Sequence, residues 1–158
     1  MPAGLISDSG RVLMARLLKG DALEGITHCA IGDGDSTFAD PINPPSPSRT
    51  QTALKHERAR KKFHKRSFLA VDPAGQALLV VNGVHYIETT APTNILGVFF
   101  VFDETEANGI TVKEYGFFGG GVTYVQGHVS DYAEGGVYHA VSNPSGKVLN
   151  PGYLYEVK

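Results

Sequence analysis

Half of the basic residues in this chain lie in one short segment, where they could bind an acidic group. Seven of the 14 Lys and Arg residues are found between positions 55 and 66: Lys55, Arg58, Arg60, Lys61, Lys62, Lys65 and Arg66. Local positive charge attracts phosphate or an acidic protein surface, and nucleic-acid binding through it would depend strongly on salt. Only Phe63 and Phe68 could stack on bases. We expect a contact with an acidic partner or a neighbouring subunit rather than with nucleic acid, and a solvated strand face is the alternative interpretation.

Three aspartates near a glycine-rich turn offer oxygen atoms of the kind that bind calcium. Asp33, Asp35 and Asp40 follow one another closely, but no later glutamate completes the spacing of an EF-hand loop. A turn stabilised by aspartate side chains is therefore the preferred interpretation. The histidines and Cys29 lack the paired spacing of a zinc site. We expect neither a metal ion nor another cofactor.

The sequence contains no local motif of a hydrolase or of a nucleotide-binding enzyme. It lacks a G-x-S-x-G turn, an H-E-x-x-H helix and a G-x-x-x-x-G-K-[ST] phosphate loop, and no lysine follows the glycines at 119–121. We therefore expect no enzymatic activity. A carbohydrate-binding module is the competing hypothesis, with a shallow aromatic site around Tyr132, Tyr138 or Tyr153. Because the chain has no Trp, the stacking surface of such a site would be modest.

Length and composition indicate a single globular domain that is rich in β-structure. The chain has 158 residues, of which 42% are hydrophobic and 19% are charged, and one core is enough at this length. Its 19 Gly and 9 Pro residues favour many turns and short strands. The single cysteine, Cys29, lies in an apolar run and is expected in the core. No signal peptide or membrane-spanning run is recognisable, so we expect synthesis and folding in the cytoplasm.

The first half of the chain predicts one helix, a strand, a long loop and a basic strand. Ser7 is a suitable N-cap for a helix over residues 8–19, which ends at a glycine. A strand is predicted over residues 26–31, before a tight turn. Four prolines then predict an extended loop between residues 35 and 50, without regular pairing. The basic segment could form a helix or a strand, and we prefer a strand that begins near Glu57.

The middle of the chain predicts a hairpin and a central strand. Residues 78–81 and 84–87 are apolar runs on either side of Asn82-Gly83, a dipeptide that favours a two-residue hairpin, although a bulge is the alternative. Residues 94–102 are the most hydrophobic stretch and predict a central strand. Phe99 and Phe100 would point to opposite faces of that strand, so one of them needs a second covering layer.

The last third of the chain predicts further strands around a loop. A strand is predicted over residues 110–115, and residues 122–129 are expected to pair back across it. Residues 130–146 have the composition of a loop. Alternating apolar residues within 147–158 predict a last strand.

Five segments follow one another in an order that is typical of a known family. They are Gly4-Leu5-Ile6-Ser7-Asp8-Ser9-Gly10, Ile26-Thr27-His28-Cys29-Ala30-Ile31-Gly32-Asp33-Gly34, residues 52–66, Ile110-Thr111-Val112-Lys113-Glu114-Tyr115-Gly116-Phe117-Phe118, and Gly152-Tyr153-Leu154. The set resembles the attachment domains of tailed-phage baseplate, tail-collar and tail-fibre proteins, which also occur in phage-derived contractile particles. Those domains typically contain "G-x-T-x-x-G-x-x-x-L-A", "I-T-x-x-A-V-G-D-G", "T-A-L-x-x-E-x-x-R" and "I-x-E-I-G-L-F". These motifs are structural signatures without a catalytic residue.

The expected fold is an α+β, mostly β domain over residues 1–158. In it, an N-terminal helix packs on a mainly antiparallel sheet or sandwich, and the Pro-rich loop between residues 35 and 50 is long and extended. The resemblance implies a structural virion protein of a phage or phage-like tail, made in the cytoplasm of the bacterial host. Because the chain has no repetitive shaft or receptor-binding tip, we expect a baseplate component or a tail-fibre attachment adaptor.

The expected partners are other tail or baseplate subunits and the tail fibre, with several copies of the chain in one particle and no membrane insertion. A carbohydrate-binding, receptor-recognition module of a tail tip is the alternative. The residues that we expect to bind a partner are Lys61, Lys62, Lys65, Arg66, Pro44 and Pro45.

Overall fold

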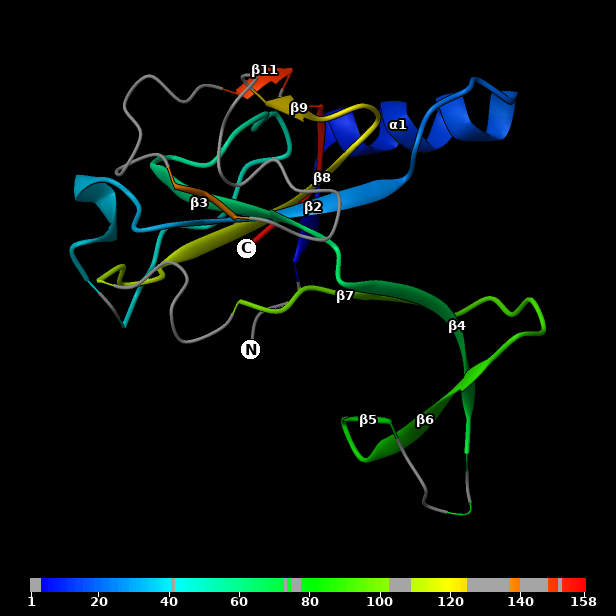
Figure 1. The fold of residues 1–158 in the computed structure, drawn as a ribbon. Coiled ribbons are helices and arrows are strands. Elements are labelled where there is room, and N and C mark those ends of the chain that lie inside the picture. Colours follow the sequence, from blue (N-terminus) through cyan, green and yellow to red (C-terminus); the bar gives the residue numbers. More distant parts are fainter. Residues whose placement is uncertain are drawn as a thin grey trace. The chain divides into compact units, whose positions relative to one another are not determined.

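The computed structural model describes residues 4–40, 42–72, 74, 78–102, 109–124, 137–139, 148–150 and 152–158. Two compact units are distinguished within the stretch for which we predicted one attachment domain. Unit 1 comprises residues 1–62 and 102–158, and unit 2 comprises residues 63–101. Each unit has its own antiparallel β-structure (Figure 1).

The N-terminal helix α1 spans Asp8–Lys19, as the capping signals predicted. Ser7 has an extended backbone, and its Oγ accepts a hydrogen bond from the Gly10 amide at 3.0 Å. This bond satisfies one of the amides that a helix start leaves without a backbone partner. Gly20 adopts the left-handed conformation, with φ of 92°, and closes the helix. Leu13 is 1% exposed, and α1 packs against the strand that ends the described chain.

Unit 1 is built on a six-stranded antiparallel sheet with the order β1-β12-β8-β2-β3-β10 (Figure 1). Its strands are β1 (Leu5–Ile6), β2 (Ile26–Gly32), β3 (Glu57–Lys62), β8 (Glu114–Gly119), β10 (Val137–His139) and β12 (Tyr153–Val157). Strand β2 lies between β8 and β3, so that Cys29 is paired with Phe117 on one side and with Lys61 on the other. A two-stranded sheet joins β9 (Thr123–Tyr124) to β11 (Val148–Asn150). The described fold is mostly β with an N-terminal helix, which confirms the predicted fold class.

The core of unit 1 is formed by residues that lie far apart in the sequence. The buried cluster comprises Ala30, Leu54, Phe118, Leu154 and Val157. Burial of a large apolar side chain contributes roughly 1.5–3 kcal/mol, so these contacts dominate the stability of the sheet. Cys29 is 7% exposed and is among the buried apolar residues, which confirms its predicted burial.

The predicted loop between residues 35 and 50 contains one short 3-10 helix, η1 (Ser36–Phe38), and no strand among its described residues. Its prolines remove backbone donors that a ladder would need, which accounts for this confirmed prediction. In the part of the chain that the structure describes, no helix combines the length and the apolar composition that a bilayer span needs.

Unit 2 is a four-stranded antiparallel sheet with the order β5-β6-β4-β7. Its strands are β4 (Lys65–Val71), β5 (Leu79–Val81), β6 (Val84–Thr89) and β7 (Leu96–Phe99). Strands β5 and β6 form a hairpin in which Val81 pairs with Val84. Asn82 and Gly83 have φ of 50° and 79°, the positive values that a type I′ turn requires. The hairpin is thus confirmed over the alternative of a bulge.

One expectation about residues 57–102 was wrong, and another holds only in part. The hydrophobic stretch at 94–102 was predicted to be a central strand, but its strand β7 lies at an edge of the four-stranded sheet, where Leu96 is 58% exposed. The basic strand begins at Glu57 as predicted, but it ends at Lys62, and a second strand begins at Lys65. The amide of His64 donates to the carbonyl of Phe99 at 2.8 Å, so the chain leaves β3 to pair within unit 2.

The last third of the chain also departs from the predicted strands. The strand predicted over residues 110–115 begins only at Glu114. The described part of residues 122–129 forms β9, which pairs with β11 instead of β8, and residues 125–129 lie outside the described residues. The predicted loop at 130–146 contains β10, which pairs with β3. The predicted last strand is present as β11 and β12.

Candidate partner-binding site

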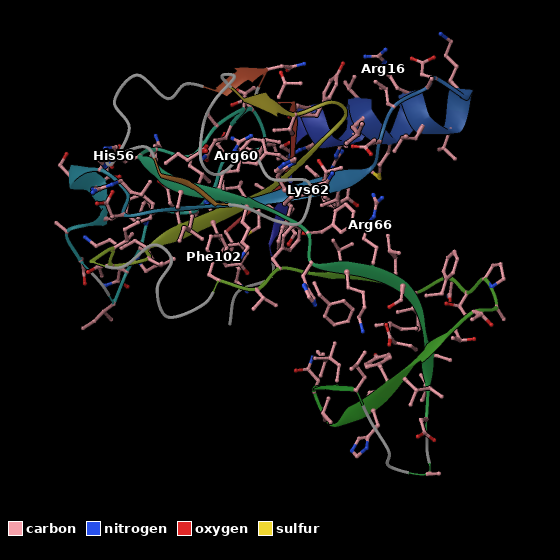
Figure 2. All side chains as sticks on the ribbon, viewed as in Figure 1. Arg16, His56, Arg60, Lys62, Arg66 and Phe102 are labelled. Atoms are coloured by element: carbon pink, nitrogen blue, oxygen red, sulfur yellow. The ribbon has the colours of Figure 1, made fainter. Side chains whose placement is uncertain are left out.

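Strand β3 carries the basic segment but buries one of its arginines. Arg60 is 1% exposed, and its guanidinium lies 3.8 Å from the centroid of the Phe118 ring. Its Nε and Nη2 atoms donate to the Glu57 carboxylate at 2.8 and 2.7 Å. Figure 2 shows this side chain on β3, within unit 1. A buried arginine that is stacked and bound by a carboxylate at two atoms stabilises the sheet, and it is not accessible to another chain.

A second part of the basic segment is neutralised by Asp33, one of the three aspartates considered for a metal site. The Asp33 carboxylate pairs with Arg58 and accepts from Nδ1 of His56 at 2.6 Å. Asp35 accepts from the Thr37 amide at 2.9 Å and caps η1, and this bonding with Thr37 lowers the pKa of Asp35. These two carboxylates therefore hold the loop in shape.

The third aspartate, Asp40, accepts hydrogen bonds from the Ile42 amide and from Nδ2 of Asn43, both at 2.9 Å. The Asn43 bond is the main reason that the pKa of Asp40 is lowered. Among the described residues, no group of three or more His, Cys, Asp or Glu side chains is arranged to hold a metal ion. Asp35 and Asp40 thus stabilise turns, as the preferred interpretation of the sequence proposed, whereas Asp33 binds side chains of the basic segment.

The four basic residues predicted to bind a partner fall into the two different units. Lys61 and Lys62 end β3 in unit 1, whereas Lys65 and Arg66 begin β4 in unit 2 (Figure 2). Successive strand residues point to opposite faces, so each pair is also divided between two sides of its sheet. Lys61 lies 5.9 Å from the centroid of the Phe102 ring.

In unit 2 both predicted cations have partners within the unit. The Lys65 ammonium binds the Glu88 carboxylate at 2.8 Å. The guanidinium of Arg66 lies 4.0 Å from the centroid of the Phe63 ring, within the range of a cation–π contact.

The two predicted prolines, Pro44 and Pro45, do line a pocket of about 210 Å³ in unit 1. The other lining residues are Phe38, Ser46, Pro47, Gln51, Lys55, Lys113, Glu114, Val157 and Lys158. The walls are mainly apolar, and three lysines lie among the lining residues. Such a pocket fits an apolar side chain that is flanked by an acidic group.

Sequence reasoning missed Lys113 and Glu114 as parts of this pocket. Glu114 is 2% exposed, and its two carboxylate oxygens accept from the amides of Lys55 and His56 at 2.9 and 2.8 Å. It thereby ties the residues just before β3 to β8. The glutamate of the "I-x-E" motif was the available signal, because a carboxylate at a fixed motif position often accepts backbone amides.

The titratable residues of β2 are held in their neutral forms. Burial lowers the pKa of His28 to about 3, with a further contribution from the positive charges of Arg60 and Lys62. Burial raises the pKa of the Cys29 thiol to about 12. A thiol with that pKa is a poor nucleophile at neutral pH, and His28 already bonds Thr27 at 2.7 Å through Nδ1.

Of the three tyrosines proposed for a sugar site, Tyr153 is the one whose side chain the structure describes. Its hydroxyl accepts from Nη1 of Arg16 at 2.6 Å, and the same guanidinium lies 5.9 Å from the ring centroid. Tyr132 lies outside the described residues, and Tyr138 is placed in β10 by its backbone. Tyr153 therefore takes part in docking α1 onto β12.

The segments that carry the family resemblance meet in unit 1, to which all of their residues belong except residues 63–66 at the end of the third. The first meets the last, because the amide of Ser7 donates to the carbonyl of Tyr155 at 3.0 Å and Ser9 Oγ donates to that of Leu154 at 2.7 Å. A Cβ atom at Gly10 would lie 2.7 Å from Cα of Tyr155. The helix can lie this close to β12 because residue 10 is a glycine and has no Cβ atom.

The three middle segments meet in the same way. The second and fourth pair as β2 and β8, and the third reaches the fourth through the two amides that bind Glu114. A Cβ atom at Gly116 would lie 2.8 Å from Leu154 and 3.1 Å from Leu54, so this glycine makes room for the core. The motif residues thus serve contacts within the chain.

No protein-family model matches the chain, and no curated protein matches it either.

Proposed function

We propose that the chain is a structural protein of a phage or phage-like tail, where it acts as a baseplate component or as an adaptor that attaches the tail fibre. One observation carries the proposal: the segments that resemble tail attachment domains, although spread along the sequence, contact one another in unit 1, apart from residues 63–66 of the third. Such contacts are what an attachment domain of that family would need, and they support the proposal. The proposed role needs no catalytic residue, because it consists in binding neighbouring subunits.

Partner binding is the proposed task of the Pro-rich pocket and of the cations on the surface of β3. The pocket offers apolar walls with lysines among its lining residues, which suits a segment of a neighbouring subunit that carries an apolar side chain next to a carboxylate. Repetition of the chain around the tail axis would multiply such modest contacts. The proposed location is the virion, after synthesis in the cytoplasm of the bacterial host.

The proposal is tested by immunogold electron microscopy of purified tail particles, with an antibody raised against the recombinant chain. Label concentrated at the distal end of the tail is the expected result. The controls are preimmune serum and particles from a strain in which the gene has been deleted. Absence of label from both intact and disrupted particles would overturn the virion role and would favour a free binding module.

A further inference from the structure

The turn between β5 and β6 carries two groups that can react with each other. Asn82 and Gly83 are both exposed, and a Cβ atom added at Gly83 would meet no other atom within 4 Å. Among the hydrogen bonds of the described residues, none involves the Asn82 carboxamide or the Gly83 amide. The backbone nitrogen after an asparagine can attack the side-chain carbonyl carbon, and a following glycine leaves that approach open because it has no side chain.

The other asparagines that the structure describes lack this combination. Asn43 and Asn150 each precede a proline, which has no backbone N–H to attack with. Asn94 precedes Ile95, whose amide already donates to Oγ1 of Thr93 at 3.2 Å. The β-branched side chain of Ile95 also crowds the approach. Of the described asparagines, Asn82 is therefore the one with a free and unhindered nucleophile beside it.

The hairpin that holds Asn82 is also easily opened. Ring closure requires the Asn82 backbone to leave the turn conformation, in which its φ is 50°. Strand β5 has only three residues, lies at an edge of the four-stranded sheet, and has an exposed side chain at each position. A segment with few buried contacts opens locally at small cost in free energy. The fold therefore gives Asn82 little protection against the reaction.

We propose that Asn82 is a site of spontaneous covalent modification, at which its side-chain amide is converted into a carboxylate. Solvent hydroxide removes the Gly83 amide proton, and the nitrogen attacks Cγ of Asn82. The N–Cγ bond forms, the Cγ–Nδ2 bond breaks, and Nδ2 leaves as ammonia with a proton from water, so that a succinimide ring remains. Water then opens the ring at one of its two carbonyl carbons and gives aspartate or isoaspartate. The overall reaction consumes one water molecule, releases ammonia and changes no oxidation state.

The isoaspartate product changes the hairpin. Its main chain runs through the former side chain and is longer by one methylene group. The two-residue turn depends on positive φ at Asn82 and Gly83, and it brings Val81 opposite Val84. A longer link no longer fits this turn, so the pairing of β5 with β6 loosens. The product also carries one more negative charge than the chain, whose formal net charge is -2. The reaction needs no enzyme, and it is independent of the proposed tail role.

Site-resolved mass spectrometry of the aged full chain tests the proposal. The chain is incubated at neutral and at alkaline pH, digested, and analysed by electron-transfer fragmentation, which separates isoaspartate from aspartate at each position. This keeps apart any product at Asn108, which also precedes a glycine and lies outside the described residues. Product at Asn82 should form at least about tenfold faster than at Asn94, where a hydrogen bond must break first, and faster still at alkaline pH. Reaction at Asn82 that is no faster than at Asn94 would overturn the proposal.

Asn82→Gly is the matched variant for the effect on the hairpin, because it removes the carboxamide while a Gly-Gly pair still suits the turn. The readout is hydrogen exchange, by NMR, of the Leu78 amide, which donates to the carbonyl of Tyr86 at 2.9 Å. In the isoaspartate product, isolated by anion exchange, this amide should exchange at least about tenfold faster than in the fresh chain. Aged Asn82→Gly protein should show no change. Unchanged exchange in the product, or equal acceleration in the aged variant, would refute the opening of the hairpin by modification of Asn82.

Discussion

Replacement of Gly10 by alanine offers a direct test of how α1 is docked on β12. In an exposed helix, Gly→Ala stabilises by about 1 kcal/mol, because alanine is the better helix former. Here the added Cβ would lie 2.7 Å from Cα and 2.9 Å from the carbonyl carbon of Tyr155. Carbon atoms in contact prefer about 3.5–4.0 Å. The helix would therefore have to move by about 1 Å, and the sign of the usual effect should be reversed.

The magnitude follows from the contacts that such a movement disturbs. Overpacking against backbone that cannot rotate away costs about 1–3 kcal/mol. The movement also strains the hydrogen bonds that Ser7 and Ser9 donate to the Leu154 carbonyl, each of which contributes about 1 kcal/mol. After subtraction of the gain in helix propensity of about 1 kcal/mol, we expect Gly10→Ala to lower the free energy of unfolding by about 2 kcal/mol.

Urea denaturation followed by circular dichroism at 222 nm measures this change, because the described α-helix lies in unit 1. Gly25→Ala is the matched control. A Cβ atom added at Gly25 would meet no other atom within 4 Å, and this glycine is not among the residues with positive φ. That substitution should leave stability unchanged or raise it by up to about 1 kcal/mol. A Gly10→Ala protein that is as stable as the wild type, or more stable, would refute the described docking of the helix.

Three further predictions concern buried polar groups of unit 1. Glu114→Ala removes the acceptor of two backbone amides and should lower the free energy of unfolding, measured in urea, by about 2–4 kcal/mol. Glu24→Ala on the surface should change it by less than about 0.5 kcal/mol. Equal effects of the two substitutions would contradict the role of Glu114. The pKa of the Cys29 thiol is raised to about 12 in the folded protein, so at pH 8 the thiol of the urea-unfolded chain should react with a disulfide reagent at least roughly a thousandfold faster than that of the native protein. Similar rates in the two states would show that the thiol is not buried. The pKa of His28 is about 3 in the folded protein and 6.5 ordinarily, so the imidazole binds a proton more readily in the unfolded chain. Its contribution to stability is therefore complete above about pH 6.5 and is lost as the pH falls toward 3. This amounts to about 2 kcal/mol between pH 7 and pH 5, and His28→Asn should flatten the measured pH dependence; an unchanged slope would contradict a neutral buried imidazole.

The elements that could be predicted from the sequence are those fixed by neighbouring residues. The helix starts at its Ser7 cap and ends at Gly20, both of which act within one turn. The hairpin follows from Asn82 and Gly83, which accept positive φ. In each case the interaction that determines the structure spans only a few residues, so it can be recognised in the sequence.

The separation of unit 2 could not be predicted, because no glycine or proline marks the boundary. The sequence around Phe63 and His64 continues the basic strand without a turn signal. The strand ends there because His64 pairs with Phe99, a residue brought near by the path of the whole unit. The hydrophobicity of β7 predicted a central position, since burial usually follows apolar composition. That inference fails in a unit whose apolar faces remain exposed.

The two prolines of the candidate site could be predicted from the sequence, but the pairing of the charged side chains within each unit could not. A run of seven cations looks like a surface for phosphate, yet Arg58 and Arg60 are bound by carboxylates of the same unit. Lys65 is paired in the same way within unit 2. Each internal pair removes one charge that could release counterions from a nucleic acid, and such release is the main source of affinity for phosphate backbones. The charge that remains can orient a protein partner, while the binding energy has to come from apolar surface. The described chain offers that surface in the pocket of Pro44 and Pro45.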